Sequence, residues 1–147
     1  RIESKKNILK LIRSFYEILS SGQDLQLVLV GKRGMDSDLV DAFLKKYNMR
    51  ESVIFTNYVS EEEKQYLLAN AELFMMLSRY EGFGLPILEA FYAEIPVVAS
   101  DIPVFRELFK NELIFVNPAL TKAWLIIGIP EPPPIVQILI LVFIFSI

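Results

Sequence analysis

Amphipathic helical segments alternate with short apolar runs along residues 1–118, and this alternation limits the possible folds more than any other feature of the chain. Apolar residues recur at helical spacing at residues 8–19 and 39–47. A capping box, with Ser60 at the N-cap and Glu63 three residues on, predicts a helix to about residue 70, and further short helices are expected at residues 86–93 and 104–109. Short apolar runs typical of buried strands lie at residues 25–30, 53–55, 73–77, 97–99 and 113–116. The alternation predicts an α/β domain with a parallel sheet and helices on both faces.

Right-handed crossovers would wind these elements into a Rossmann-like, doubly wound sheet. Ligands of such sheets bind beyond the carboxyl ends of the strands. The corresponding segments of this chain are residues 31–34, 57–60, 78–85 and 100–103. We therefore expect the functional residues to lie in these four segments or next to them.

The composition limits which side chains can take part in catalysis or metal binding. The chain has no cysteine and no histidine, which excludes disulfides, thiolate metal sites and the most common general base. The formal net charge of -3 gives no indication of a nucleic-acid partner. Chemistry in this chain must therefore use carboxylates, Lys, Arg, backbone groups or the ligand itself.

The segment Glu81–Ala90 follows a predicted buried strand and opens a helix. Gly82 and Gly84 allow unusual backbone dihedrals and a close approach of a ligand. Pro86 suits a first helical turn, where its missing N–H is not needed. Free N–H groups near Leu85, together with the helix dipole, favour an anion. The segment predicts an anion-binding turn.

Two glutamates flank this turn, Glu81 before the glycines and Glu89 in the predicted first helical turn. A carboxylate repels an anion, so we expect both to face neutral hydroxyls beside it, such as those of a sugar or ribose next to a diphosphate. The alternative is that both glutamates only complement the positive end of the helix.

The run EGFGLPILEA resembles the signature of family 4 retaining glycosyltransferases and their glycogen synthase relatives, in which seven residues separate two glutamates. Further stretches resemble the same family in order and spacing: RIESKKN, LVLVG, VIFTNYVSEEE and IPVVASDIPVFREL. The resemblance covers Arg1 to about Pro118 and corresponds to the C-terminal, donor-binding half of a GT-B enzyme. It implies that residues 1–118 form a nucleotide-sugar-binding domain.

The resemblance also implies roles for basic and acidic residues. Arg1 and Lys6 would bind the donor diphosphate and stabilise the departing nucleoside diphosphate, which suits their charge. A solvated surface patch is their alternative. Glu81 would face the transferred sugar near the reaction centre, and Glu89 would bind the ribose hydroxyls.

Other residues would surround the donor. Backbone groups of Gly82, Phe83, Gly84 and Leu85 would contact its sugar and phosphate. Gly31 follows a predicted strand and is placed with them at the donor site by the resemblance. Tyr58 and Val59 would border the nucleobase, although packing at the edge of the sheet explains their side chains equally well.

The expected function is hexose transfer from a nucleoside-diphosphate sugar to an acceptor held by an N-terminal domain absent from this chain. The resemblance implies that the reaction needs no metal and no cofactor besides the donor substrate. The alternatives are a non-catalytic nucleotide- or phosphosugar-binding module and a GT-B nucleotide-sugar epimerase, though such epimerases usually use histidine. We expect the full enzyme in the cytoplasm, with peripheral association at the cytoplasmic face of the membrane left open.

Two stretches depart from the family. Glu94 stands where the family usually has glycine at the end of the signature helix, a position that often needs left-handed dihedrals. Residues 119–147 resemble nothing in the family and end in an apolar run of thirteen residues, Ile135–Ile147. Because a membrane span needs about 20 residues, a truncated membrane segment and out-of-frame sequence are equally acceptable interpretations. No fold is assigned to this tail.

Overall fold

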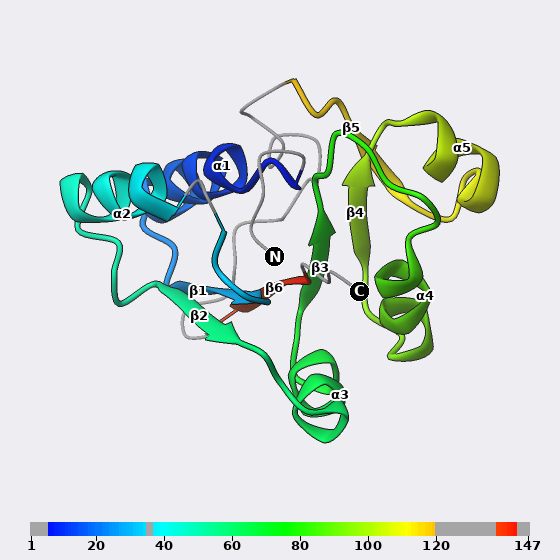
Figure 1. The fold of residues 1–147 in the computed structure, drawn as a ribbon, viewed down its shortest axis with the longest axis horizontal. Coiled ribbons are helices and arrows are strands. Elements are labelled where there is room, and N and C mark those ends of the chain that lie inside the picture. Colours follow the sequence, from blue (N-terminus) through cyan, green and yellow to red (C-terminus); the bar gives the residue numbers. More distant parts are fainter. Residues whose placement is uncertain (1–5, 35–36, 120–137, 144–147) are drawn as a thin grey trace.

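The computed structural model describes residues 6–34, 37–119 and 138–143. The helices are α1 (Ile8–Ser20), α2 (Ser37–Lys46), α3 (Glu61–Ala69), α4 (Leu85–Tyr92) and α5 (Pro103–Phe109). The strands are β1 (Leu25–Val30), β2 (Val53–Asn57), β3 (Leu73–Met76), β4 (Val97–Ser100), β5 (Ile114–Val116) and β6 (Ile138–Phe143). The predicted alternation of helices and strands is confirmed from α1 to β5 (Figure 1).

The strands form one sheet in the order β2-β1-β6-β3-β4-β5. Each neighbouring pair is parallel. The carboxyl ends of the strands therefore meet at a single edge of the sheet, where ligands of this fold class bind.

Helices cover both faces of the sheet, so the doubly wound α/β class is confirmed. Leu27 and Leu29 of β1 belong to a buried cluster that includes residues of α1 and α2. Val28 and Val30, which point to the other face, belong to a second cluster that includes residues of α3, α4 and α5. The near-continuous apolar character of β1 follows from this burial on both sides.

Strand β6 comes from the apolar tail to which the sequence assigned no fold. It lies between β1 and β3 and pairs with β1 along its whole length, from Leu25↔Ile138 to Val30↔Phe143. A short apolar run is compatible with a membrane segment and with a strand buried on both faces, and periodicity cannot separate the two. Because residues 120–137 lie outside the described ones, the domain boundary at residue 118 stays a prediction.

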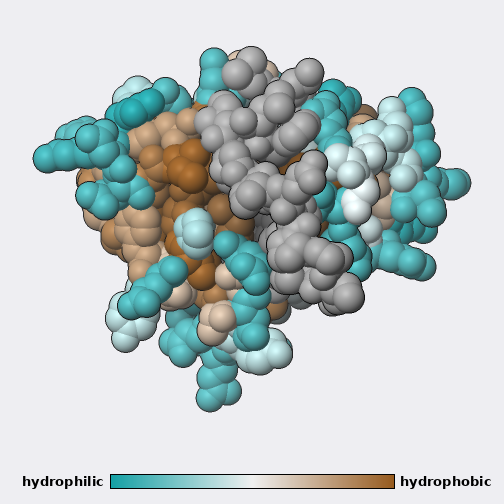
Figure 2. All heavy atoms as spheres, turned by 180° about the vertical axis from the view of Figure 1, so that it is seen from behind, coloured by the Kyte–Doolittle hydropathy of each residue, from teal (hydrophilic) through white to brown (hydrophobic). Residues whose placement is uncertain are grey.

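Hydrophobic residues also reach the surface. Seen from behind, a broad area of hydrophobic side chains lies beside hydrophilic ones (Figure 2). Several large apolar side chains are exposed in or near α4, including Phe83 (50%), Leu85 (52%) and Tyr92 (94%). Among the helices that the structure describes, none is long and apolar enough to cross a membrane.

Candidate functional site

The turn between β3 and α4 begins the helix without a side-chain cap. Gly84 is the N-cap residue, in a left-handed conformation with φ of 90°. Helix α4 begins at Leu85, and Pro86 lies in its first turn, as the sequence predicts. Since Gly84 has no side chain to accept a hydrogen bond, N–H groups at this helix start are left for solvent or a ligand.

The two glycines of the turn differ in what they require. A Cβ atom on Gly84 would lie 2.8 Å from Cε1 of Phe105, and the positive φ adds strain. A Cβ on Gly82 would meet no atom within 4 Å, and its φ is not positive. The expectation of unusual dihedrals at both positions is therefore wrong for Gly82.

Lys6 and Glu81 meet although they lie far apart in the sequence. The Nζ atom of Lys6 donates a hydrogen bond of 2.5 Å to Oε1 of Glu81. Both side chains are largely buried, with exposed fractions of 7% and 14%. Asn7, the left-handed N-cap of α1, anchors this region by donating from Nδ2 to the carbonyl oxygen of Pro118 at 3.0 Å. Arg1, the third predicted catalytic residue, lies outside the described residues.

Glu89 has a partner that sequence reasoning missed. Lys64 of α3 donates from Nζ to Oε1 of Glu89 at 2.8 Å and also pairs with Glu61 at 2.7 Å. Burial at this position lowers the pKa of Lys64, but hydrogen bonds to Glu61 and Glu89 outweigh that effect, and its pKa lies above the ordinary 10.5. A signal was present in the sequence, because Lys64 lies four residues before Leu68 on the buried side of α3. A lysine at such a position requires an anionic partner.

Glu89 does not lie in the first turn of α4, contrary to the sequence-based expectation. The helix begins at Leu85, which makes Glu89 its fifth residue, and the first turn contains no acidic residue. The helix dipole acts mainly within the first turn. The ion pair with Lys64 therefore explains the side-chain position of Glu89 better than the helix-dipole alternative does.

The remaining predicted residues lie at neighbouring strand ends. Gly31 follows β1 with φ of 134°, and its N–H donates to the carbonyl oxygen of Asn57 at 2.8 Å. Tyr58 is 89% exposed. Together with Val59 and Tyr66 it lines a hollow of about 440 Å³ that neither Glu81 nor Glu89 lines. The residues predicted to border the nucleobase, Tyr58 and Val59, thus line a hollow that is separate from the two glutamates.

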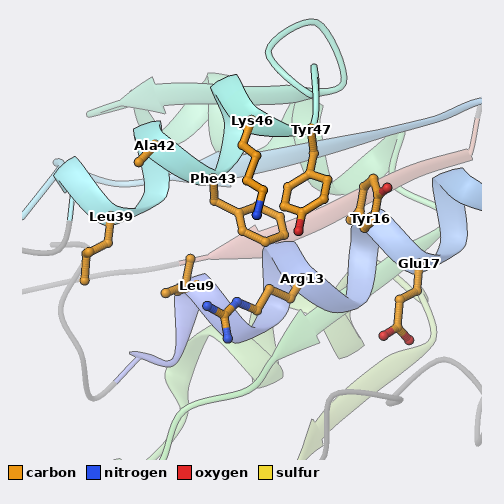
Figure 3. Close-up of a pocket in the computed structure, with 9 residues that line it drawn as sticks. All are labelled: Leu9, Arg13, Tyr16, Glu17, Leu39, Ala42, Phe43, Lys46 and Tyr47. Atoms are coloured by element: carbon orange, nitrogen blue, oxygen red, sulfur yellow. The ribbon is translucent and has the colours of Figure 1, made fainter.

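A separate hollow of about 530 Å³ lies between α1 and α2 (Figure 3). Its aromatic side chains pack on one another, with ring centroids of Tyr16 and Tyr47 4.4 Å apart. The guanidinium of Arg13 lies 5.6 Å from the ring centroid of Phe43. None of the residues predicted to bind a ligand lines this hollow.

Acidic residues do not cluster as metal ligands in the described part of the chain. There, no group of three or more Asp or Glu side chains is placed to hold a metal ion. A reaction without metal stays a prediction.

Comparisons with known proteins identify the family of the chain. The family model described as glycosyl transferases group 1 matches residues 1–124. The serotype-specific mannosyltransferase WbdA of Escherichia coli is 32% identical over 75% of the chain, and O-antigen chain mannosyltransferase B of Escherichia coli is 33% identical over 80%. The chain spans 14% and 31% of the length of these two relatives.

A solved structure supports the fold. The Anabaena protein HepE, in complex with UDP and glucose, superimposes with a TM-score of 0.73 at 22% sequence identity over 86% of this chain and 35% of its own. On the match of residues 1–124 to the family model, this chain belongs to the glycosyl transferases group 1 family, as a C-terminal domain of GT-B type.

Proposed function

We propose that the chain is the donor-binding domain of a retaining hexosyltransferase that uses a nucleoside-diphosphate sugar. The observation that carries the proposal is the turn Glu81–Glu89, whose two glutamates are each paired with a buried lysine on either side of an uncapped helix start. The lysines hold the carboxylates in place, and the helix start offers N–H groups to phosphate.

Lys6 fits the role of diphosphate ligand. Its ammonium group has three N–H donors, of which one is used by Glu81. The other two would donate to phosphate oxygens, and the positive charge would stabilise the nucleoside diphosphate as it departs. Glu81 then stands next to the transferred sugar, and Arg1 supplies a second cation for the diphosphate.

The remainder of the turn and the neighbouring loop would hold the rest of the donor. Backbone groups of Phe83, Gly84 and Leu85 contact the sugar and phosphate. Glu89 accepts hydrogen bonds from the ribose. Tyr58 and Val59 border the base at the hollow they line.

The relatives support a hexose as the transferred group, because both relatives described above are named mannosyltransferases. HepE binds UDP and glucose on a similar fold. The relatives are much longer than this chain, so we assign acceptor binding to a further domain. We place the reaction in the cytoplasm, at the face of the membrane where O-antigen acceptors would be met.

Calorimetric titration of the chain with UDP, GDP and ADP tests this function. We expect saturable binding of at least one of them, weakened about tenfold by Lys6→Ala and by Glu89→Ala, since each removes a charge-assisted contact. The exposed Glu107 on α5 provides the matched control, and Glu107→Ala should bind like the parent chain. Absence of saturable binding, or equal binding by all three variants, would contradict the proposal.

An activity assay of the chain joined to an N-terminal acceptor domain distinguishes a transferase from a protein that only binds the nucleotide. A transferase releases nucleoside diphosphate and a glycosylated acceptor. The alternative of a binding module predicts neither product, and an epimerase would return a nucleotide sugar of inverted configuration.

A further inference from the structure

Glu89 uses only one of its two carboxylate oxygens in this structure. Its Oε1 accepts the hydrogen bond from Lys64 at 2.8 Å. Its Oε2 is buried and has no hydrogen-bond partner among the described residues. A buried acceptor without a donor costs free energy, and native structures keep such atoms only rarely. The unused oxygen therefore needs a donor that comes from outside the described chain.

We propose that Lys64 is a positioning residue that clamps Oε1 of Glu89 and thereby presents Oε2 to a ribose hydroxyl of the donor. This inference rests on the proposed function and extends it to a residue of α3. The hydroxyl would donate its hydrogen bond to Oε2, while Lys64 itself would make no contact with the donor.

The surroundings of Lys64 suit a clamp. Its side chain is 9% exposed and is held at the same time by Glu61 of its own helix and Glu89 of α4. A glutamate side chain loses considerable rotamer freedom when it is ordered. Because Lys64 holds Glu89 before the donor arrives, that cost does not weaken donor binding.

The local charge also selects the kind of group that Oε2 can receive. Two carboxylates, Glu61 and Glu89, share the single cation of Lys64. The cluster therefore keeps a net negative charge, which attracts hydroxyl donors and repels phosphate. At the other end of the turn, Lys6 pairs with Glu81. Hydroxyl recognition therefore falls to Glu89, positioned by Lys64, and phosphate recognition to Lys6.

The test compares a bound nucleoside diphosphate with its 2′,3′-dideoxy analogue, which lacks the ribose hydroxyls. The parent chain should prefer the hydroxylated ligand. Lys64→Met, similar in size but uncharged, should lower affinity for that ligand about tenfold and leave affinity for the dideoxy analogue unchanged. Lys64→Arg keeps the charge and should restore part of the preference.

A purely structural tie between α3 and α4 predicts a different pattern. Loss of that contact would lower the affinity for both ligands equally. This result would overturn the inference and leave the proposed function intact. Failure of the parent chain to bind any nucleoside diphosphate would overturn both. If Lys64→Met does not fold by circular dichroism, Lys64→Gln replaces it, and an unchanged preference for hydroxyls in that variant would equally overturn the inference.

Discussion

The two ends of the turn Glu81–Glu89 are held from opposite faces of the sheet. Glu81 is tied to Lys6, which precedes α1, a helix of the first buried cluster. Glu89 is tied to Lys64 in α3, a helix of the second cluster. The first pair is the more buried, since Glu81 is 14% exposed and Glu89 34%. The position of this short turn therefore depends on the helices that cover both faces of the sheet.

Replacing Lys6 should break the more buried ion pair, Lys6–Glu81, and cause the largest loss of stability. Lys6→Met leaves Glu81 as a buried charge without its partner, and we expect the free energy of unfolding to fall by about 3–5 kcal/mol. Urea unfolding measures this. The double variant Lys6→Met/Glu81→Gln should recover part of the loss, because no unpaired charge remains. A loss no larger than that of Lys64→Met would show that the two ties do not differ as described.

Gly84 lies between the two ties, and Gly84→Ala should destabilise the turn itself. The left-handed φ and the contact with Phe105 together predict a fall in unfolding free energy of about 2–4 kcal/mol. Gly82→Ala is the matched control and should change stability by less than about 0.5 kcal/mol, since its Cβ meets open space. Equal effects at the two positions would refute the distinction between them.

The cap of α3 should affect the second tie only. Ser60 Oγ accepts from the N–H of Glu63 at 3.2 Å, and Glu63 Oε2 accepts from the N–H of Ser60 at 2.6 Å, so the predicted capping box is confirmed. Ser60→Ala should lower the unfolding free energy by about 1 kcal/mol, and nucleotide affinity should fall less than with Lys64→Met.

The same cap gives a pH dependence. The hydrogen bond from the backbone of Ser60, followed by that of its side chain, holds the pKa of Glu63 below its ordinary 4.5. A depressed folded-state pKa stabilises the protein above 4.5, and this contribution disappears as pH falls through the lowered value. The stability difference between the parent and Glu63→Gln should therefore be present at neutral pH and shrink in acid. A difference that grows in acid would contradict this assignment.

A substitution at Glu94, at the end of α4, should have the smallest effect on stability, and it should stabilise the protein. Glu94 has φ of 58°, and hydrogen bonds from its N–H to Phe91 and from Ile95 to Ala90 close the helix in a Schellman arrangement. Glu94→Gly should raise the melting temperature, corresponding to about 1 kcal/mol, because glycine adopts this conformation without strain. Glu94→Ala keeps the Cβ atom and should bring no such gain; a matching gain would rule out the backbone explanation.

Much of this arrangement could be predicted from sequence because local signals agreed with the fold. Apolar runs such as β1 and the Ser60 capping box each indicate an element without reference to distant residues. The left-handed conformation at Glu94 was expected from the missing glycine. The resemblance placed Lys6 and Glu81 at one site, and the structure brings them into contact.

The features that the sequence did not predict all depend on contacts between residues far apart in the chain. The partnership of Lys64 with Glu89 joins two helices, and no local spacing specifies which carboxylate a buried lysine meets. Strand β6 was missed because its place between β1 and β3 depends on pairing with distant strands. Gly82 and Gly84 look equivalent in the sequence, and only the position of Phe105 separates them.

The central claim is that the turn Glu81–Glu89 binds a nucleoside diphosphate. Amide chemical shifts of the isotopically labelled chain, recorded while UDP or GDP is added, test it directly. We expect saturable shifts at the amides of Phe83, Gly84 and Leu85. Shifts confined to Phe43 and Tyr47 in the hollow between α1 and α2, or no saturable shift at all, would contradict it.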